Sequence, residues 1–113
     1  MTVQHVLEQV TQLVSGGDWE LIQNEHGQFR LYFGEYEFCV ITALHFVATE
    51  EVVPLGAAYE IGEAMNLGFQ GTQLVVTAAD NHENDDSNSR DMITFLTLRA
   101  TFERLSIKVA MAA

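Results

Sequence analysis

The spacing of apolar residues changes abruptly at residues 15–17, Ser-Gly-Gly, and this change constrains the fold more than any other feature of the sequence. Before it, apolar residues recur at steps of three and four, which is the period of an amphipathic helix. These residues are Val3, Val6, Leu7, Val10, Leu13 and Val14. Thr2 is suited to cap the start of this helix, and Gly16 and Gly17 are suited to end it.

After residue 17 the pattern alternates between apolar and polar side chains, as it does in half-buried β-strands. The turn-forming sequence Asn-Glu-His-Gly at 24–27 divides this region. It therefore predicts a hairpin of strands near residues 18–24 and 28–33. Gly34 turns the chain again, and Tyr36–Ile41 is predicted to be a third antiparallel strand.

The helical period returns from Thr42, which is predicted to cap a short helix. Pro54 fits the first turn of a second helix, which Leu-Gly at 67–68 would end. Residues 72–81 combine strand-forming and helix-forming residues, and we favour a helix. Ser89 can cap a final helix. The predicted fold class is α+β, with an N-terminal helix, a small antiparallel sheet of two to three strands and then three or so helices.

The chain is acidic, and its charge is unevenly distributed. It has 113 residues, of which 48% are hydrophobic, and a formal net charge of -11. This composition fits a single acidic globular domain over residues 1–113. Arg30 is the one basic residue in 1–89, and the rest follow: Arg90, Arg99, Arg104 and Lys108. So acidic a surface argues against direct binding to nucleic acid or to an anionic membrane.

No apolar run approaches the roughly 20 residues that span a bilayer, and residues 1–7 lack the basic and apolar stretches of an export signal. A single cysteine, Cys39, cannot form an internal disulfide, as is usual in a reducing compartment. We therefore expect a soluble, cytoplasmic protein.

The acidic residues have two interpretations. They can form an ordinary solvated surface, or they can form a face that docks on a basic protein surface, including one that normally holds nucleic acid. In the second interpretation the partner-binding residues are Glu35, Glu37, Glu50, Glu51, Glu60, Glu63, Asp85 and Asp86.

The sequence predicts no metal site, no cofactor and no catalytic residue. Residues 80–91 have the ligand spacing of a calcium loop, but Asp85 stands where that loop needs glycine and Asp91 where it needs a bidentate Glu. The four histidines show no zinc-binding spacing. Cys39 has no cationic neighbour in sequence to activate its thiol, so we interpret it as a small core residue.

The final helix carries more apolar surface than one core-facing stripe needs. We therefore predict a homodimer in which part of this surface is an interface between two copies. Arg99, Arg104 and Lys108 would then meet the acidic body of the other subunit. The predicted interface residues are Phe95, Leu98, Phe102 and Leu105.

Two families resemble parts of the chain. Cys-Val-Ile-Thr-Ala-Leu at 39–44, followed by Leu-Gly at 67–68 and Ala-Ala-Asp-Asn at 78–81, resembles small uncharacterised phage and prophage proteins. Val40 stands where their Cys-Pro-Ile-Thr-Ala-type turn has proline. The resemblance implies mostly helical structure over residues 38–95 and brings no assigned activity. Length, acidity, the opening helix, the strand series and the stretch 65–72 are similar to type III secretion chaperones, which are acidic α+β homodimers that hold unfolded effectors.

Charge and resemblance together predict a non-catalytic acidic protein-binding module. The favoured interpretation is a phage or mobile-element inhibitor that occupies a basic, nucleic-acid-binding surface of a host machine such as a defence nuclease complex. The alternatives are a type III secretion chaperone-like homodimer, and a small enzyme or divalent-ion-binding protein.

Overall fold

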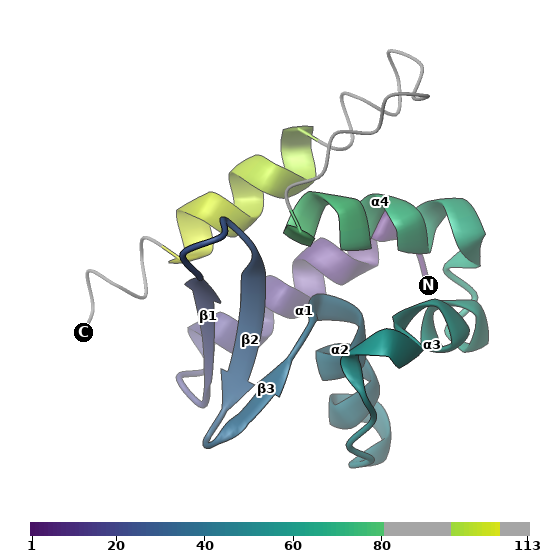
Figure 1. Ribbon diagram of the computed structural model, residues 1–113, viewed down its shortest axis with the longest axis horizontal. Coiled ribbons are helices and arrows are strands. Elements are labelled where there is room, and N and C mark those ends of the chain that lie inside the picture. The colour runs from purple at the N-terminus through teal and green to yellow at the C-terminus, as the bar shows by residue number, and fades with distance from the viewer. Residues whose placement is uncertain (81–95, 107–113) are drawn as a thin grey trace.

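The structure is a computed structural model, and it describes residues 1–80 and 96–106. A helix precedes a three-stranded antiparallel sheet and further helices follow, which confirms the predicted α+β class. In Figure 1 the sheet lies in front of α1, with α2 and α3 to one side and with α4 and the helical residues 96–106 across the top. The elements are α1 (Val3–Ser15), β1 (Trp19–Gln23), β2 (Phe29–Phe33), β3 (Tyr36–Phe38), α2 (Val40–Thr49), a 3-10 turn η1 (Leu55–Ala57), α3 (Ala58–Ala64) and α4 (Gly68–Asp80).

Helix α1 begins and ends where the sequence predicts. The Thr2 hydroxyl accepts a hydrogen bond from the backbone N–H of His5 at 3.2 Å, which satisfies one of the free donors at the helix start. The helix ends at Ser15, and Gly17 follows with a φ of 89°. One face of the helix packs into the core through Val6, Leu7, Val10 and Val14.

The predicted hairpin and the third strand form one sheet in the order β1-β2-β3. In the first turn, the Asn24 side-chain oxygen accepts hydrogen bonds from the N–H groups of His26 and Gln28, each at 2.9 Å. This asparagine therefore organises the turn through its own side chain. The second turn is a two-residue loop in which Gly34 has a φ of 61°, a backbone conformation that favours glycine.

The strand predicted for Tyr36–Ile41 is too long, because β3 ends at Phe38 and α2 begins at Val40. Cys39, not Thr42, caps the helix: its sulfur accepts a bond from the Thr42 N–H at 3.5 Å. The Thr42 hydroxyl donates back to the Cys39 carbonyl at 3.2 Å and is buried in the first turn. The apolar run around this junction has no clear period, so the sequence alone does not locate the boundary.

The end predicted for the second helix, at Leu67-Gly68, is also wrong. Helix α3 ends at Ala64, and Asn66 takes the left-handed conformation with a φ of 60°. The N–H groups of Asn66 and Leu67 then bond to the carbonyls of Glu63 and Gly62, both at 3.0 Å. This pattern is the usual glycine-type helix stop with asparagine in the glycine position. Gly68 begins α4 instead, and α4 confirms a helix over residues 72–80.

The final helix, described over residues 96–106, closes one end of the core. Phe102 is fully buried, with its ring centroid 5.6 Å from that of Phe29 on β2. Leu98 and Leu105 are buried beside it, at 0% and 4% exposure. This corrects the predicted interface, because these three side chains are enclosed within a single chain. Phe95 lies outside the described residues, and a homodimer stays a prediction without these three residues as its interface.

Within residues 1–80 and 96–106, the helices are too short or too polar to cross a membrane.

Candidate functional site

The candidate site is a cluster of aromatic side chains at one end of the sheet, called here the aromatic end. It consists of Trp19, Phe33, Tyr36, Phe38 and Phe46. The strand register places Trp19 opposite Phe33 and Phe33 opposite Tyr36, so these three form one row across the inner face. Their exposure rises along the row, from 6% for Trp19 to 37% for Phe33 and 55% for Tyr36.

Helix α2 completes the aromatic end through Phe46. The Phe46 ring centroid lies 5.1 Å from that of Phe38, 5.8 Å from that of Phe33 and 6.0 Å from that of Trp19. Such spacing is typical of favourable tilted ring pairs. Because Trp19 and Phe38 are buried, they fix the positions of the partly exposed rings beside them. The exposed part is therefore a preorganised apolar surface.

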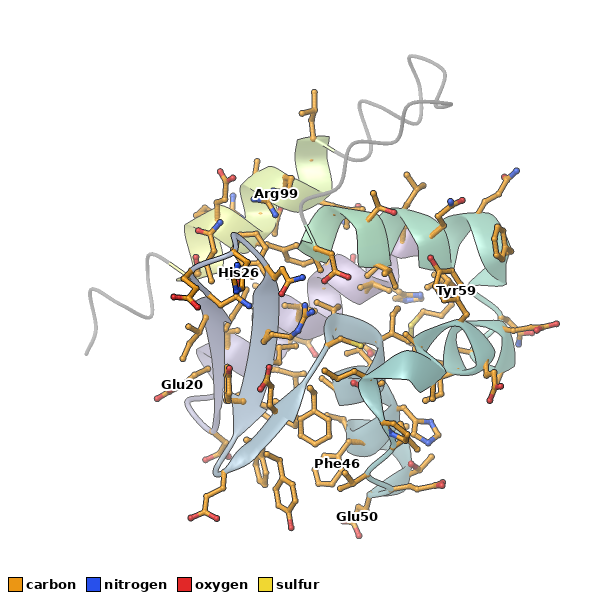
Figure 2. All side chains as sticks on the ribbon, in the orientation of Figure 1. Glu20, His26, Phe46, Glu50, Tyr59 and Arg99 are labelled. Atoms are coloured by element: carbon orange, nitrogen blue, oxygen red, sulfur yellow. The ribbon has the colours of Figure 1, made fainter. Side chains whose placement is uncertain are left out.

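Exposed carboxylates lie on or next to the segments that carry these rings, and we call them the acidic rim: Glu35, Glu37, Glu50 and Glu51, of which Glu37 lies on the outer face of β3. Glu35 lies in the turn between Phe33 and Tyr36. Glu50 ends α2 in a left-handed conformation, and its N–H bonds to the Phe46 carbonyl at 2.7 Å. In Figure 2, Phe46 lies beside the lower end of the sheet, and Glu50 lies below it.

One acidic residue of this region was missed by sequence reasoning. Glu20 lies directly opposite Tyr32, and Tyr32 lies opposite Glu37, so two carboxylates flank one tyrosine across the outer face of the sheet. The signal was present in the alternation, since a buried Trp19 and Leu21 require Glu20 to point outward. The alignment of Glu20 with Glu37 across Tyr32 depends on the strand register, which the sequence pattern does not give.

The remaining predicted partner-binding residues are not part of the aromatic end. Glu60 and Glu63 are exposed on α3. Tyr59 on the same helix is 43% exposed and pairs with Phe69 of α4 at 5.7 Å between ring centroids. Asp85 and Asp86 lie outside the described residues. The structure thus places four of the eight predicted residues on or next to the segments of the aromatic end, and two others on a separate helix.

The opposite end of the sheet is different, because a carboxylate there is held by a largely buried arginine. Arg30 donates to the Asp80 carboxylate at 2.7 Å, and the two side chains are only 11% and 23% exposed. This contact joins β2 to the end of α4. We call this region, with Arg99 described next, the arginine end.

Arg99 is the second cation of the arginine end. Its guanidinium donates to the carbonyls of Ala78 at 2.9 Å and Gly27 at 3.2 Å, and lies 4.7 Å from the centre of the Phe29 ring. The Ala78 carbonyl belongs to the last turn of α4, where carbonyls lack helical partners and a cation is favoured. The prediction that Arg99 meets the acidic body of a second subunit is therefore wrong, because its guanidinium is bonded within its own chain.

Groups that could carry chemistry are dispersed. Cys39 is partly buried and serves as the α2 cap, where its sulfur lies 3.3 Å from the Thr42 hydroxyl. His26 contacts Glu25 at 3.5 Å, and His45 contacts Glu51 at 3.5 Å. In the part of the chain that the structure describes, His, Cys, Asp and Glu side chains form no group of three that could hold a metal ion.

Comparison of the chain with protein-family models, with curated proteins and with solved structures finds no match.

Proposed function

We propose that the protein binds a basic protein surface through the aromatic end and its acidic rim. The observation that carries this proposal is the row of rings that becomes exposed toward β3, beside carboxylates from two different elements. Aromatic side chains at the centre of a patch with a polar border are typical of the residues that dominate binding energy at protein interfaces.

Charge complementarity supports the nature of the partner. Of the arginines in the described residues, Arg30 and Arg99 are engaged at the arginine end, and Arg104 lies on the exposed side of residues 96–106. The acidic rim therefore presents negative charge to a partner. Lys and Arg side chains opposite the rim would accelerate the encounter and make it depend on salt.

Surfaces that bind nucleic acid are the protein surfaces richest in Lys and Arg. We therefore propose a nucleic-acid-binding protein as the partner, in the cytoplasm, with this chain occupying the site that nucleic acid would use. An inhibitor encoded by a phage or mobile element would act in this way on a host machine. The proposed role is binding and not catalysis.

Affinity capture from a host lysate tests the proposal with three double variants. Two of them change the net charge by the same amount, and the third leaves the net charge unchanged. We expect Glu35→Lys/Glu37→Lys to lose the captured protein, and Phe33→Ser/Tyr36→Ser to lose it as well. The matched control is Glu8→Lys/Glu25→Lys, which makes the same change in net charge at exposed positions outside the aromatic end and should retain the partner.

Salt provides the second readout of this experiment. Capture by the unmodified protein should weaken as ionic strength rises, and added nucleic acid should compete with it. Equal loss in the control and in Glu35→Lys/Glu37→Lys would show general charge attraction without a defined site. Full retention by Phe33→Ser/Tyr36→Ser would contradict the aromatic end as the binding surface.

A further inference from the structure

Residues of helices α1, α2 and α3 line an open groove of about 520 Å³. Its walls are mostly apolar side chains: Leu13, Leu44, Val47, Ala48, Ala64 and Met65. Leu44 and Ala48 are one turn apart and share a face of α2, whereas Phe46 points half a turn away toward the sheet. The groove and the aromatic end are therefore different surfaces on opposite sides of one helix.

The polar groups of the groove are few and lie among its apolar walls. They are the side chains of Gln9, Gln12, His45 and Thr49. Met1 also lines the groove, and its ammonium donates to the Met65 carbonyl at 3.0 Å. Among the described residues, no Lys or Arg side chain lines it. A volume in this range, with mostly apolar walls and a few polar groups, is typical of sites that receive apolar groups of a ligand.

Carboxylates border the groove on two sides. Glu51 contacts the lining residue His45, with 3.5 Å between its Oε2 and the His45 Nε2. Glu60 lies one helical turn before the lining residue Ala64, so the two occupy the same side of α3. Both carboxylates are exposed. An apolar channel with negative charge at its borders is complementary to a ligand that is apolar along one stripe and cationic beside it.

We propose that this groove binds the apolar face of a basic amphipathic helix from a partner protein. Side chains at i and i+4 or i and i+7 of such a helix would enter between α1 and α2, and flanking Lys or Arg would meet Glu51 and Glu60. Anionic lipid is a poorer occupant, because its headgroups would face those carboxylates. A flexible thioether such as Met65 suits side chains of varied shape. This inference does not rest on the rings of the aromatic end, although Glu51 belongs to the acidic rim and also borders the groove.

The test uses a synthetic peptide of about 18 residues, or five helical turns, with Leu at i, i+3, i+4 and i+7 and with Lys and Arg elsewhere. A peptide of the same composition with scrambled Leu positions is the control. We expect the ordered peptide to bind the full chain more tightly than the scrambled one, by tenfold or more, and to shift the methyl NMR resonance of Met65.

Two variants locate the peptide. Val47→Lys places a cation at the lip of the groove, where Val47 is 49% exposed, and should weaken binding about tenfold. Tyr36→Lys makes the same change in charge at the aromatic end, where Tyr36 is 55% exposed, and should leave peptide binding within about twofold. Because both positions are exposed, both variants should fold, which circular dichroism verifies.

Several results would overturn the groove proposal: equal binding of the scrambled peptide, no binding up to about 1 mM, no shift at Met65, or a larger loss in Tyr36→Lys than in Val47→Lys. Failure here is distinct from failure of the proposed function. Tyr36→Lys should abolish lysate capture and preserve peptide binding, and each result stands without the other.

Discussion

Acidic residues have different surroundings at the two ends of the sheet. At the arginine end, Asp80 is held by a partly buried Arg30, and Arg99 bonds to carbonyls from α4 and from the first hairpin turn. At the aromatic end, Glu35 and Glu37 stand in solvent beside exposed rings. In Figure 2, Arg99 and His26 mark the first end, and Phe46 and Glu50 mark the second.

Carboxylates of the two kinds contribute differently to the stability of the fold. A carboxylate with a buried cationic partner contributes to folding, and its removal leaves the partner uncompensated. An exposed carboxylate contributes little to folding and repels its acidic neighbours. The net charge of -11 therefore does not describe one uniform surface. It includes an Asp80 that is paired with Arg30 at one end of the sheet and exposed carboxylates at the other.

Among the charged side chains, the largest effect on stability is expected at Arg99. Arg99→Met should lower the free energy of unfolding by about 2–4 kcal/mol, because the Ala78 and Gly27 carbonyls lose a charged donor and Phe29 loses the cation above its ring. Urea denaturation measures this change. Arg104→Met, an exposed position on the same helix, is the matched control and should change stability by less than about 0.5 kcal/mol. Equal effects of the two variants would contradict a stabilising role for the Arg99 contacts with Ala78, Gly27 and Phe29.

An intermediate effect is expected for the ion pair. Asp80→Asn should lower stability by about 1–2 kcal/mol, less than the loss of a fully buried charge, because both side chains keep some solvent exposure. Combining Asp80→Asn with Arg30→Gln should cost less than the sum of the single changes, as measured in a double-mutant cycle. Strict additivity would mean that Arg30 and Asp80 do not interact.

The smallest effect on stability is expected at Tyr36 of the aromatic end. Tyr36→Ala should change the free energy of unfolding by less than about 0.5–1 kcal/mol, because Tyr36 is 55% exposed. Phe38→Ala, two residues along the same strand and 1% exposed, is the comparison and should cost about 3–5 kcal/mol. Thermal melts of both variants test this contrast. A Tyr36→Ala loss close to that of Phe38→Ala would make Tyr36 a core residue and not a binding residue.

Local signals in the sequence determined the first half of the fold. The helical spacing over residues 3–14, the alternation from residue 19 and the turn at 24–27 each act through neighbours within about four residues. For the same reason the Thr2 cap was predictable. The junction at Cys39 was not, because an apolar run fits both a buried strand and a buried helix.

Only the tertiary structure decided the rest. From the sequence pattern, the final helix has more apolar residues than one core-facing stripe needs. In the structure its residues Leu98, Phe102 and Leu105 are buried and fill one end of the core. Arg99 bonds to residues 21 and 72 positions away in the chain, and no local pattern encodes such a partner. Likewise, Trp19, Phe33 and Phe46 meet only through strand register and helix docking. Spacing along the chain determines which side of an element is apolar, but burial depends on which other elements pack against that side.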